Sequence, residues 1–236
     1  MIPKTIHYCW FGRKPLPKLA QACIASWKKY LPDYKIIEWN EDTFDIYSNE
    51  YTKSAYLQGK YAYVTDYIRL YALYEHGGIY MDTDVEVLKS LDVFLHHPAF
   101  SGFERENTVP TGIMASEKGG VWVKTLLGLY KDKKFDINEG TNVVLITEAM
   151  KSWGIVLDNS YQELRNQVVF YPNDYFCPMG PCGRKLRLTQ NSHTIHHFAG
   201  SWLPLKTKIR IKIMKMLPDS IESFCRKIGR IIYRIK

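Results

Sequence analysis

The chain has 236 residues, of which 46% are hydrophobic and 24% are charged, and its formal net charge is +8. This length suits one large domain or two small ones, and the composition is typical of a globular rather than a disordered protein. The sequence contains no run of about 18 apolar residues, which argues against a membrane-spanning helix. Residues 1–12 lack the long apolar stretch of a signal peptide, so we expect no targeting segment before the fold.

The five cysteines form no regular pattern. Cys177 and Cys182 are the one close pair, whereas a structural zinc site usually has a second Cys/His pair at matching spacing. We therefore interpret the cysteines as reduced thiols of a cytoplasmic protein.

The positive charge is concentrated at the C-terminal end. Residues 206–236 contain ten Lys/Arg and two Asp/Glu, while residues 1–205 contain 22 of each kind. A neutral main body argues against a nucleic-acid-binding domain, so we expect no nucleic acid partner. The basic segment instead indicates contact with an anionic surface.

Strand-like and helix-like patterns alternate along the chain. We expect strands at 4–11, 34–42, 78–82, 99–104, 111–116, 167–172 and 193–200, and helices at 16–34, 61–78, 120–130 and 141–153. Gly77 supplies the stop signal of the second helix. The initial order of strand, helix, strand, helix, strand predicts an α/β fold with a mostly parallel sheet and helices on its faces.

Two aspartates, Asp82 and Asp84, come directly after the expected strand at 78–82. Ligand sites of α/β folds lie at the carboxyl ends of strands. Residues two apart in an extended segment point the same way, so both carboxylates can converge on one hard cation. A solvated turn is the alternative interpretation of so short a motif. The Gly-Gly turn before it and the apolar residues on both sides favour a site.

Asp66 and Arg69 lie three positions apart on the expected helix, so they share one face. An ordinary surface ion pair is one interpretation, and such pairs contribute little. The neighbours at helical spacing are mostly aromatic and aliphatic. A charged pair in so apolar a helix favours a position facing a ligand cleft.

Four segments that span most of residues 1–203 resemble family 32 of the retaining glycosyltransferases. They read IPKTIHYCWFG, SWKKYLPDYKIIEWNED, AYVTDYIRLYALYEHGGIYMDTDVEVLKSLD and HHFAGSW. The third also resembles the glucosyltransferase domain of the large clostridial toxins. The resemblance implies a GT-A-like domain over residues 1–205, a Mn²⁺ or Mg²⁺ ion, and a UDP- or GDP-sugar donor.

The resemblance also implies roles for the residues of the D-x-D segment. Asp84 is expected to be the direct metal ligand. Asp82 is expected to contact the ribose and sugar hydroxyls of the donor, or to reach the metal through water. Thr83, between them, is placed in the nucleotide-sugar site.

Three residues outside that segment are expected at the donor by the same resemblance. Asp66 and Arg69 would hold the sugar and ribose side, with Arg69 near the phosphates. Trp10 resembles the aromatic residue that stacks on the nucleotide base. Simple core packing explains Trp10 equally well.

The segment HHFAGSW is expected to close the far wall of the site. A histidine completes the metal shell in related enzymes, and the His-x-x-Gly spacing to Gly200 favours His197 over His196. Ser201 and Trp202 resemble a pair that donates hydrogen bonds to the β-phosphate. A satisfied core histidine is the alternative for a single His, but two in succession before Gly-Ser-Trp favour the site.

Residues 139–150 border the acceptor side of the donor sugar in relatives. Many relatives carry Gly-Pro here, and Asn142 stands where proline is common. By analogy we expect front-face attack with retention, with the leaving phosphate helping to deprotonate the acceptor. The candidate catalytic residues are Asp82, Asp84, Arg69 and Asn142.

The basic segment 206–236 alternates charged and apolar residues in two expected helices that Pro218 separates. Such helices lie on anionic membrane surfaces. Helices packed on the domain with a solvated basic face are the alternative. Membrane contact would place the protein at the inner face of the plasma membrane, where a lipid-linked saccharide could be the acceptor.

Together these patterns predict an enzyme that transfers a hexose from a nucleotide sugar to a saccharide acceptor in cell-surface polysaccharide synthesis. Two alternatives remain open. A metal-dependent nucleotide-sugar hydrolase would turn over equally with or without an acceptor. A non-catalytic membrane-surface binding module would show no metal dependence.

Overall fold

The computed structural model describes residues 1–178, 186–200 and 209. Every element described below belongs to one compact unit, Met1–Phe198. Ser201, Trp202 and all of the basic segment except Ile209 lie outside the described residues, so the expectations for them are carried forward as proposals.

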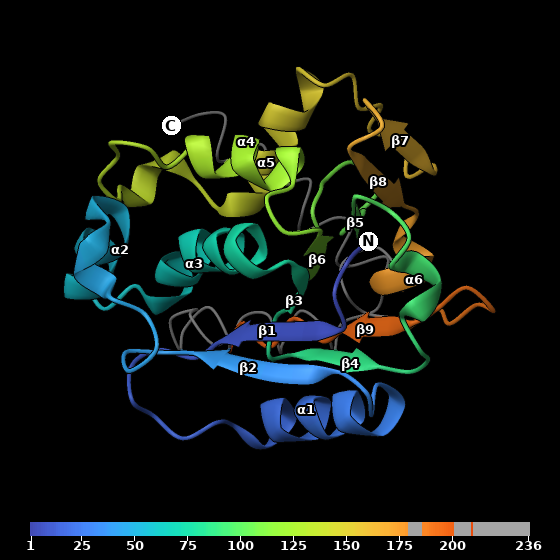
Figure 1. The fold of residues 1–236 in the computed structure, drawn as a ribbon, viewed down its shortest axis with the longest axis horizontal. Helices are drawn as coiled ribbons and strands as arrows, with labels where there is room; N and C mark the ends of the chain where they lie inside the picture. The colour runs from blue at the N-terminus through green and yellow to red at the C-terminus, as the bar shows by residue number, and fades with distance from the viewer. Residues whose placement is uncertain (179–185, 201–208, 210–236) are drawn as a thin grey trace. The chain divides into compact units, whose positions relative to one another are not determined.

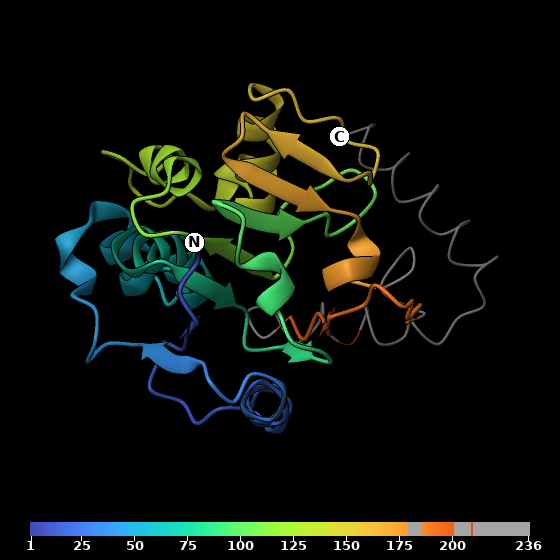
Figure 2. The ribbon, with the colours of Figure 1, turned by 45° about the vertical axis from the view of Figure 1, so that its right-hand side comes forward.

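The centre of this unit is a seven-stranded sheet in the order β2-β1-β3-β6-β5-β8-β7 (Figure 1). Its strands are β1 (Thr5–Cys9), β2 (Lys35–Trp39), β3 (Gly78–Met81), β5 (Ala99–Gly102), β6 (Ile113–Ser116), β7 (Gln162–Leu164) and β8 (Val168–Tyr171). Five strands run in one direction, and β6 and β7 run against them. The expected α/β class with a mostly parallel sheet is confirmed. In Figure 2 the strand at 99–102 (green) runs alongside the strand at 168–171 (orange), as their parallel pairing requires.

Six α-helices are described: α1 (Lys18–Tyr30), α2 (Glu50–Leu57), α3 (Tyr61–His76), α4 (Val121–Gly128), α5 (Asn142–Lys151) and α6 (Asn173–Phe176). Three short 3₁₀ helices join them: η1 (Ile46–Ser48), η2 (Asp92–Phe94) and η3 (Ile137–Glu139). In Figure 1, α3, α4 and α5 lie on one side of β1 and β2, and α1 lies on the other.

Both faces of the central sheet are buried. Ile79 and Met81 of β3 pack into the core that contains Trp27 of α1. Tyr80, between them, packs into the opposite core with Ile68 of α3. This alternation is the period of a strand, and burial on both faces explains why the strands read as continuous apolar runs.

A second, two-stranded antiparallel sheet pairs β4 (Val85–Val87) with β9 (Thr194–His196). Val85 is opposite His196, and the indole N–H of Trp27 donates to the carbonyl of Val85 at 2.7 Å. The sequence predicted a longer strand at 193–200 and none at 85–87. Since β4 follows the D-x-D segment directly, this pairing brings a distant part of the chain to the two aspartates.

Two glycines carry the chain from α3 into β3 without a linker. Gly77 and Gly78 have φ angles of +67° and +116°, which favour glycine. A Cβ atom on Gly78 would lie 2.5 Å from the carbonyl oxygen of Thr5. The tight junction fixes the position of Asp66 on α3 relative to Asp82 after β3.

Helix α2 was not predicted, although its local signal is clear. Asn49 caps its N-terminus by accepting hydrogen bonds from the backbone N–H groups of Tyr51 and Thr52. The helix has only eight residues, too few to show a distinct helical stripe. The short elements β7 and α6 were missed for the same reason.

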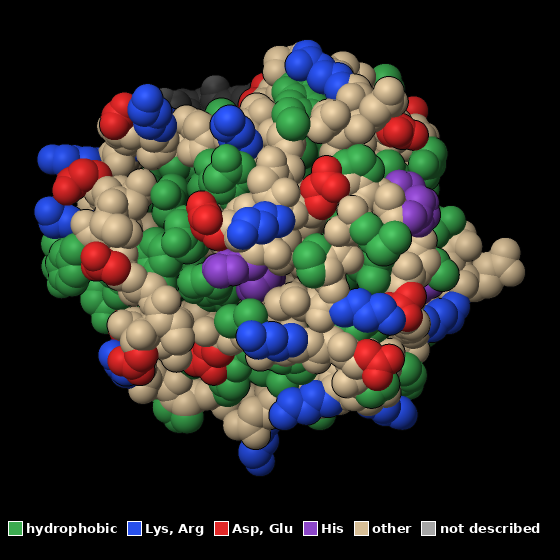
Figure 3. Space-filling view, viewed as in Figure 1, with side chains coloured by type: hydrophobic (Ala, Val, Ile, Leu, Met, Phe, Trp, Pro, Cys, Tyr) green, Lys and Arg blue, Asp and Glu red, His purple; other side chains and the backbone are tan. Residues whose placement is uncertain are grey.

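The surface in the view of Figure 3 carries interspersed Lys/Arg and Asp/Glu side chains rather than a field of one sign. This agrees with the balanced charge of residues 1–205. Within the described ranges, no helix combines the length and the apolar character needed to cross a membrane.

Candidate active site

Asp82 and Asp84 lie in the turn between β3 and β4. The backbone N–H of Asp82 donates to the carbonyl of Gly112 at 2.9 Å, and the N–H of Val85 donates to the carbonyl of Asp82 at 3.0 Å. The two side chains keep 27% and 16% of their surface exposed. A ligand can therefore reach both carboxylates, while two sheets hold their backbone.

His196 joins the two aspartates in one cluster. Its Nε2 atom lies 3.3 Å from Oδ1 of Asp84, and one donor atom from each of Asp82, Asp84 and His196 lies within 4.8 Å of the others. Two carboxylates and one imidazole form a donor set that suits Mn²⁺, and the carboxylates also suit Mg²⁺. The residues present thus fit the divalent ion implied by the resemblance.

The structure places His197 elsewhere, in contrast to the sequence-based choice of this histidine. Its Nε2 atom lies 2.8 Å from Oε2 of Glu86, although its backbone N–H donates to the carbonyl of Asp84. Consecutive residues at the end of β9 point to opposite sides. The His-x-x-Gly spacing could not reveal which side faces the aspartates, because this depends on the pairing with β4.

The environment of His196 favours the protonated, positively charged form of its imidazole ring. Burial disfavours the imidazolium, but the contact with Asp84 and the charge of Asp82 outweigh burial and raise the pKa of His196 well above its ordinary value. A histidine binds a metal ion through its neutral imidazole, so a divalent ion would compete with the proton on His196.

Arg69 connects helix α3 with the aspartate turn. Its Nη2 atom lies 3.1 Å from Oδ1 of Asp66 and 3.5 Å from Oδ1 of Asp82. Its Nε atom donates to the carbonyl of Thr65, and its guanidinium carbon lies 4.6 Å above the ring of Tyr80. Both Asp66 and Arg69 are buried, so the alternative interpretation of this pair as an ordinary surface ion pair is excluded.

Tyr80 is a site residue that the sequence analysis missed. Its hydroxyl donates to Oδ1 of Asp82 at 2.9 Å, and its ring packs under Arg69. The period of two along β3 was the available signal, since Tyr80 and Asp82 are two residues apart.

Asp66 has an unusual proton affinity for a carboxyl group. Burial raises its pKa to about 7, with Asp82 acting in the same direction and Arg69 acting against it. A carboxyl group of this kind can accept or donate a hydrogen bond near neutral pH. It can therefore bind a sugar hydroxyl in either role.

Glu104 and Gly112 complete the surroundings of His196, and neither was singled out from the sequence. Oε1 of Glu104 lies 4.0 Å from Nδ1 of His196, and burial raises the pKa of Glu104. A Cβ atom on Gly112 would lie 3.1 Å from Nδ1 of His196 and 3.2 Å from Oδ2 of Asp82. Any other residue at position 112 would crowd the cluster.

Three other expected site residues within the described part of the chain are not brought into this cluster. Trp10 is half-buried against the hydrophobic core that contains Trp27 of α1. Its indole N–H donates to the carbonyl of Lys14, and this position fits the core-packing interpretation. Thr83 is half-exposed in the turn. Asn142 begins α5 and lines a separate hollow.

Two curated yeast proteins are similar to this chain. One is inositol phosphoceramide mannosyltransferase 3 of Schizosaccharomyces pombe, 29% identical over 122 residues, which are 50% of this chain and 34% of that protein. The other is mannosyl phosphorylinositol ceramide synthase CSH1 of Saccharomyces cerevisiae, 33% identical over 129 residues, which are 51% and 32% of the two chains. The chain spans about a third of the length of these relatives.

Among solved structures, the chain is similar to PaToxG Glycosyltransferase, with a TM-score of 0.50 and 19% identity over 64% of this chain and 68% of the other. This likeness supports the expected GT-A-like fold. Residues 17–101 match the family described as "Glycosyltransferase sugar-binding region containing DXD motif". Through this region, which ends beyond Asp82 and Asp84, the chain is similar to the DXD-containing glycosyltransferases, as its resemblance to family 32 led us to expect.

Proposed function

We propose that this chain is a metal-dependent glycosyltransferase that moves a hexose from a nucleotide diphosphate sugar to a saccharide acceptor. The observation that carries the proposal is the meeting of Asp82, Asp84 and His196 beside the buried Asp66–Arg69 pair. All of these residues except His196 lie within the matched family region. Metal-ligating atoms and sugar-binding groups therefore lie next to each other.

We assign Asp84 and His196 as metal ligands, with Asp82 contributing directly or through water. A bound Mn²⁺ or Mg²⁺ ion supplies positive charge where the diphosphate leaving group becomes more negative. Carboxylate oxygens are ligands that such an ion prefers. Gly112 leaves the room that the cluster needs.

We assign Arg69 to the phosphate and ribose side of the donor and Asp66 to its hexose. Arg69 is held from three sides by Thr65, Asp66 and Tyr80, so its guanidinium is oriented before the donor arrives. Such preorganisation lowers the cost of binding and of reaching the transition state.

Four further donor contacts are carried forward on the resemblance: Trp10, Thr83, Ser201 and Trp202. Trp10 would stack on the base, and Ser201 and Trp202 would donate to the β-phosphate. Asn142 would lie toward the acceptor, where front-face attack gives retention of configuration. Trp202→Ala should weaken donor binding accordingly.

The names of the two yeast relatives favour mannose as the transferred hexose and a lipid-borne acceptor, either a glycolipid or a lipid-linked oligosaccharide. A role in cell-surface polysaccharide synthesis would fit such an acceptor. The basic segment 206–236 would hold the protein peripherally at the anionic inner face of the plasma membrane.

A panel of UDP- and GDP-sugars tests the proposal by thermal shift with and without Mn²⁺. A ligand at 100 times its dissociation constant stabilises the folded state by about 2.7 kcal/mol, which such a scan detects. We expect one nucleotide sugar to raise the melting temperature only with metal, and acceptor to increase its turnover. Equal turnover without acceptor would indicate a hydrolase, and no metal-dependent shift across the panel would contradict the proposal.

A further inference from the structure

The imidazole ring of His196 is held from several sides. Its Nε2 atom lies 3.3 Å from Oδ1 of Asp84, so this nitrogen is the one that a metal ion would use. The ring of Phe198 stacks on the imidazole, with 4.1 Å between the ring centroids and 28° between the planes. Gly112 lies beside Nδ1, where a Cβ atom would come within 3.1 Å of that nitrogen. These contacts leave the ring little freedom to turn.

The Nδ1 atom of His196 is a buried polar group without a partner. It makes no hydrogen bond within the described part of the chain. When Nε2 binds a metal ion, the one proton of the neutral imidazole lies on Nδ1. Buried donors are normally paired, and metal-ligating histidines almost always donate their other N–H to a carboxylate, a carbonyl or water. A metal ion on Nε2 therefore calls for an acceptor beside Nδ1.

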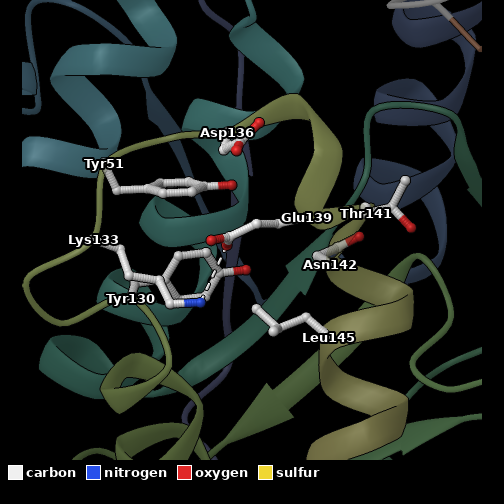
Figure 4. A pocket seen from close by; sticks show the side chains of 9 residues that line it. Tyr51, Tyr130, Lys133, Asp136, Glu139, Thr141, Asn142 and Leu145 are labelled. Atoms are coloured by element: carbon white, nitrogen blue, oxygen red, sulfur yellow. Dashed lines mark hydrogen bonds and ion pairs between the residues drawn. The ribbon is translucent and has the colours of Figure 1, made fainter.

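Glu104 is the carboxylate that lies beside this nitrogen. Its Oε1 atom is 4.0 Å from Nδ1 of His196, which is about 1 Å longer than an N–H···O hydrogen bond. The side chain is only 16% exposed, and its carboxylate accepts no hydrogen bond from the residues that the structure describes. Glu139, the carboxylate in the hollow shown in Figure 4, is instead paired with Lys133, whose Nζ lies 3.2 Å from Oε2. The Glu104 carboxylate is thus available to His196.

The backbone around Glu104 is anchored to the central sheet. The N–H of Phe103 donates to the carbonyl of Tyr171 on β8 at 2.9 Å. The N–H of Glu104 donates to the carbonyl of Thr108 at 2.9 Å and closes a turn. Because the backbone is held, rotation about the bonds of the Glu104 side chain is the movement that closes the gap to Nδ1.

The thiol of Cys177 is the rival partner for His196. Cys177 is buried directly after α6 and interacts with the imidazole, yet Nδ1 still has no hydrogen bond. Sulfur is a weak acceptor, whereas hydrogen bonds to an ionised carboxylate are among the strong ones. This difference favours Glu104 as the acceptor.

We propose that Glu104 is a positioning residue, which accepts a hydrogen bond from the Nδ1–H group of His196 and so holds Nε2 toward Asp84 and the metal ion. The inference rests on the proposed function and extends it to a carboxylate outside the set of metal ligands. Such a partner fixes the orientation of the ring and makes the metal-binding nitrogen more basic. Glu104 acts through His196 rather than on the ion.

A double-mutant cycle on the full chain tests this role, with calorimetric titration by Mn²⁺ alone. Glu104→Gln keeps the size of the side chain and removes its charge, and we expect about 10-fold weaker Mn²⁺ binding. In the His196→Gln background the same substitution should change the affinity by less than about 2-fold, because no imidazole remains to be held. Thermal melts establish that the two single variants and the double variant are folded.

Glu106→Gln and Cys177→Ala are the controls. Glu106 is an exposed carboxylate two residues after Glu104, so its variant measures the effect of losing a nearby charge. Cys177→Ala removes the rival partner. Both variants should bind Mn²⁺ as tightly as the wild type.

Wild-type Mn²⁺ affinity in folded Glu104→Gln overturns the inference, and a loss in Cys177→Ala alone would give the role to the thiol. An equal loss from Glu104→Gln in both backgrounds also overturns it, because Glu104 would then act on the ion directly. Each of these results leaves the proposed function intact if the wild-type protein needs Mn²⁺ for transfer. A wild-type protein that binds no Mn²⁺ would instead overturn the metal-dependent function and this inference together.

Discussion

The Nε2 atom of His196 lies 3.3 Å from Oδ1 of Asp84, although Asp84 follows β3 and His196 ends β9. The pairing of β9 with β4 creates this contact, because it sets His196 opposite Val85, the residue after Asp84. The candidate metal cluster therefore forms only when the last described strand has docked.

The two adjacent histidines should differ in their effect on metal binding. His196→Gln removes a group that contacts Asp84 and should weaken Mn²⁺ binding by at least about 10-fold. His197→Gln removes only the contact with Glu86 and should change Mn²⁺ binding much less. Calorimetric titration of both variants with Mn²⁺ decides between them, and a larger loss at His197 would restore the choice that the sequence spacing favoured.

Tyr80→Phe should disturb the aspartate turn without removing an ionised group. The variant loses the hydrogen bond from the Tyr80 hydroxyl to Asp82, a type of bond that contributes about 1.5–3 kcal/mol. We expect a lower free energy of unfolding and several-fold weaker donor binding. Urea denaturation and calorimetry measure the two effects, and unchanged donor binding would remove Tyr80 from the site.

The stability of the protein should fall in mild acid because of His7. Burial lowers the pKa of His7 to about 4, and its ring contacts the carbonyl of Gly77 and the indole N–H of Trp39. The unfolded chain takes up a proton near pH 6.5, so the unfolded state binds more protons below that pH. The contribution of the neutral, buried His7 to the free energy of unfolding is fully present above pH 6.5. It is lost as the pH falls to about 4, and the loss is about 3 kcal/mol.

Urea denaturation at pH 7 and pH 4.5 measures this loss. His7→Gln should be less stable at pH 7 but should show a smaller change between the two pH values. The exposed His96 provides the control, and His96→Gln should keep the wild-type difference. An equal pH dependence in His7→Gln and wild type would contradict the assignment.

The basic segment should direct the protein to anionic membranes. Each Lys or Arg near an anionic leaflet contributes about 1 kcal/mol of attraction, which fades with salt. Deletion of residues 206–236 should abolish cosedimentation with anionic vesicles and should slow transfer to a lipid-linked acceptor more than to a soluble one. Replacement of its Lys and Arg residues by Gln is the milder control. Equal binding of the intact protein to anionic and neutral vesicles at low salt would contradict the membrane interpretation.

Much of the fold was predictable because its main elements carry strong local signals. The apolar strand at 78–81 and the helix at 61–76 were located to within one or two residues, since periodicity and the Gly-Gly stop define them. The short strand β4 was missed because three residues carry too little pattern, and only its long-range partner β9 stabilises it.

The candidate site was predictable in part. Asp66 and Arg69 belong to α3, and Asp82 and Asp84 follow the next strand; the resemblance to family 32 placed all four at the donor. The choice between His196 and His197 depended on strand register across the β4–β9 pair, which one sequence does not encode locally.

Metal-dependent sugar transfer by Asp84→Asn and wild-type protein tests the central claim most directly. The measurement is transfer of labelled hexose from the nucleotide sugar to acceptor across a titration of Mn²⁺, with the exposed Asp33→Asn as a control for the loss of one charge. We expect wild type and Asp33→Asn to require Mn²⁺, and Asp84→Asn to fold normally but to be about 10²- to 10³-fold slower. Wild-type rates in folded Asp84→Asn at limiting Mn²⁺ would contradict the account.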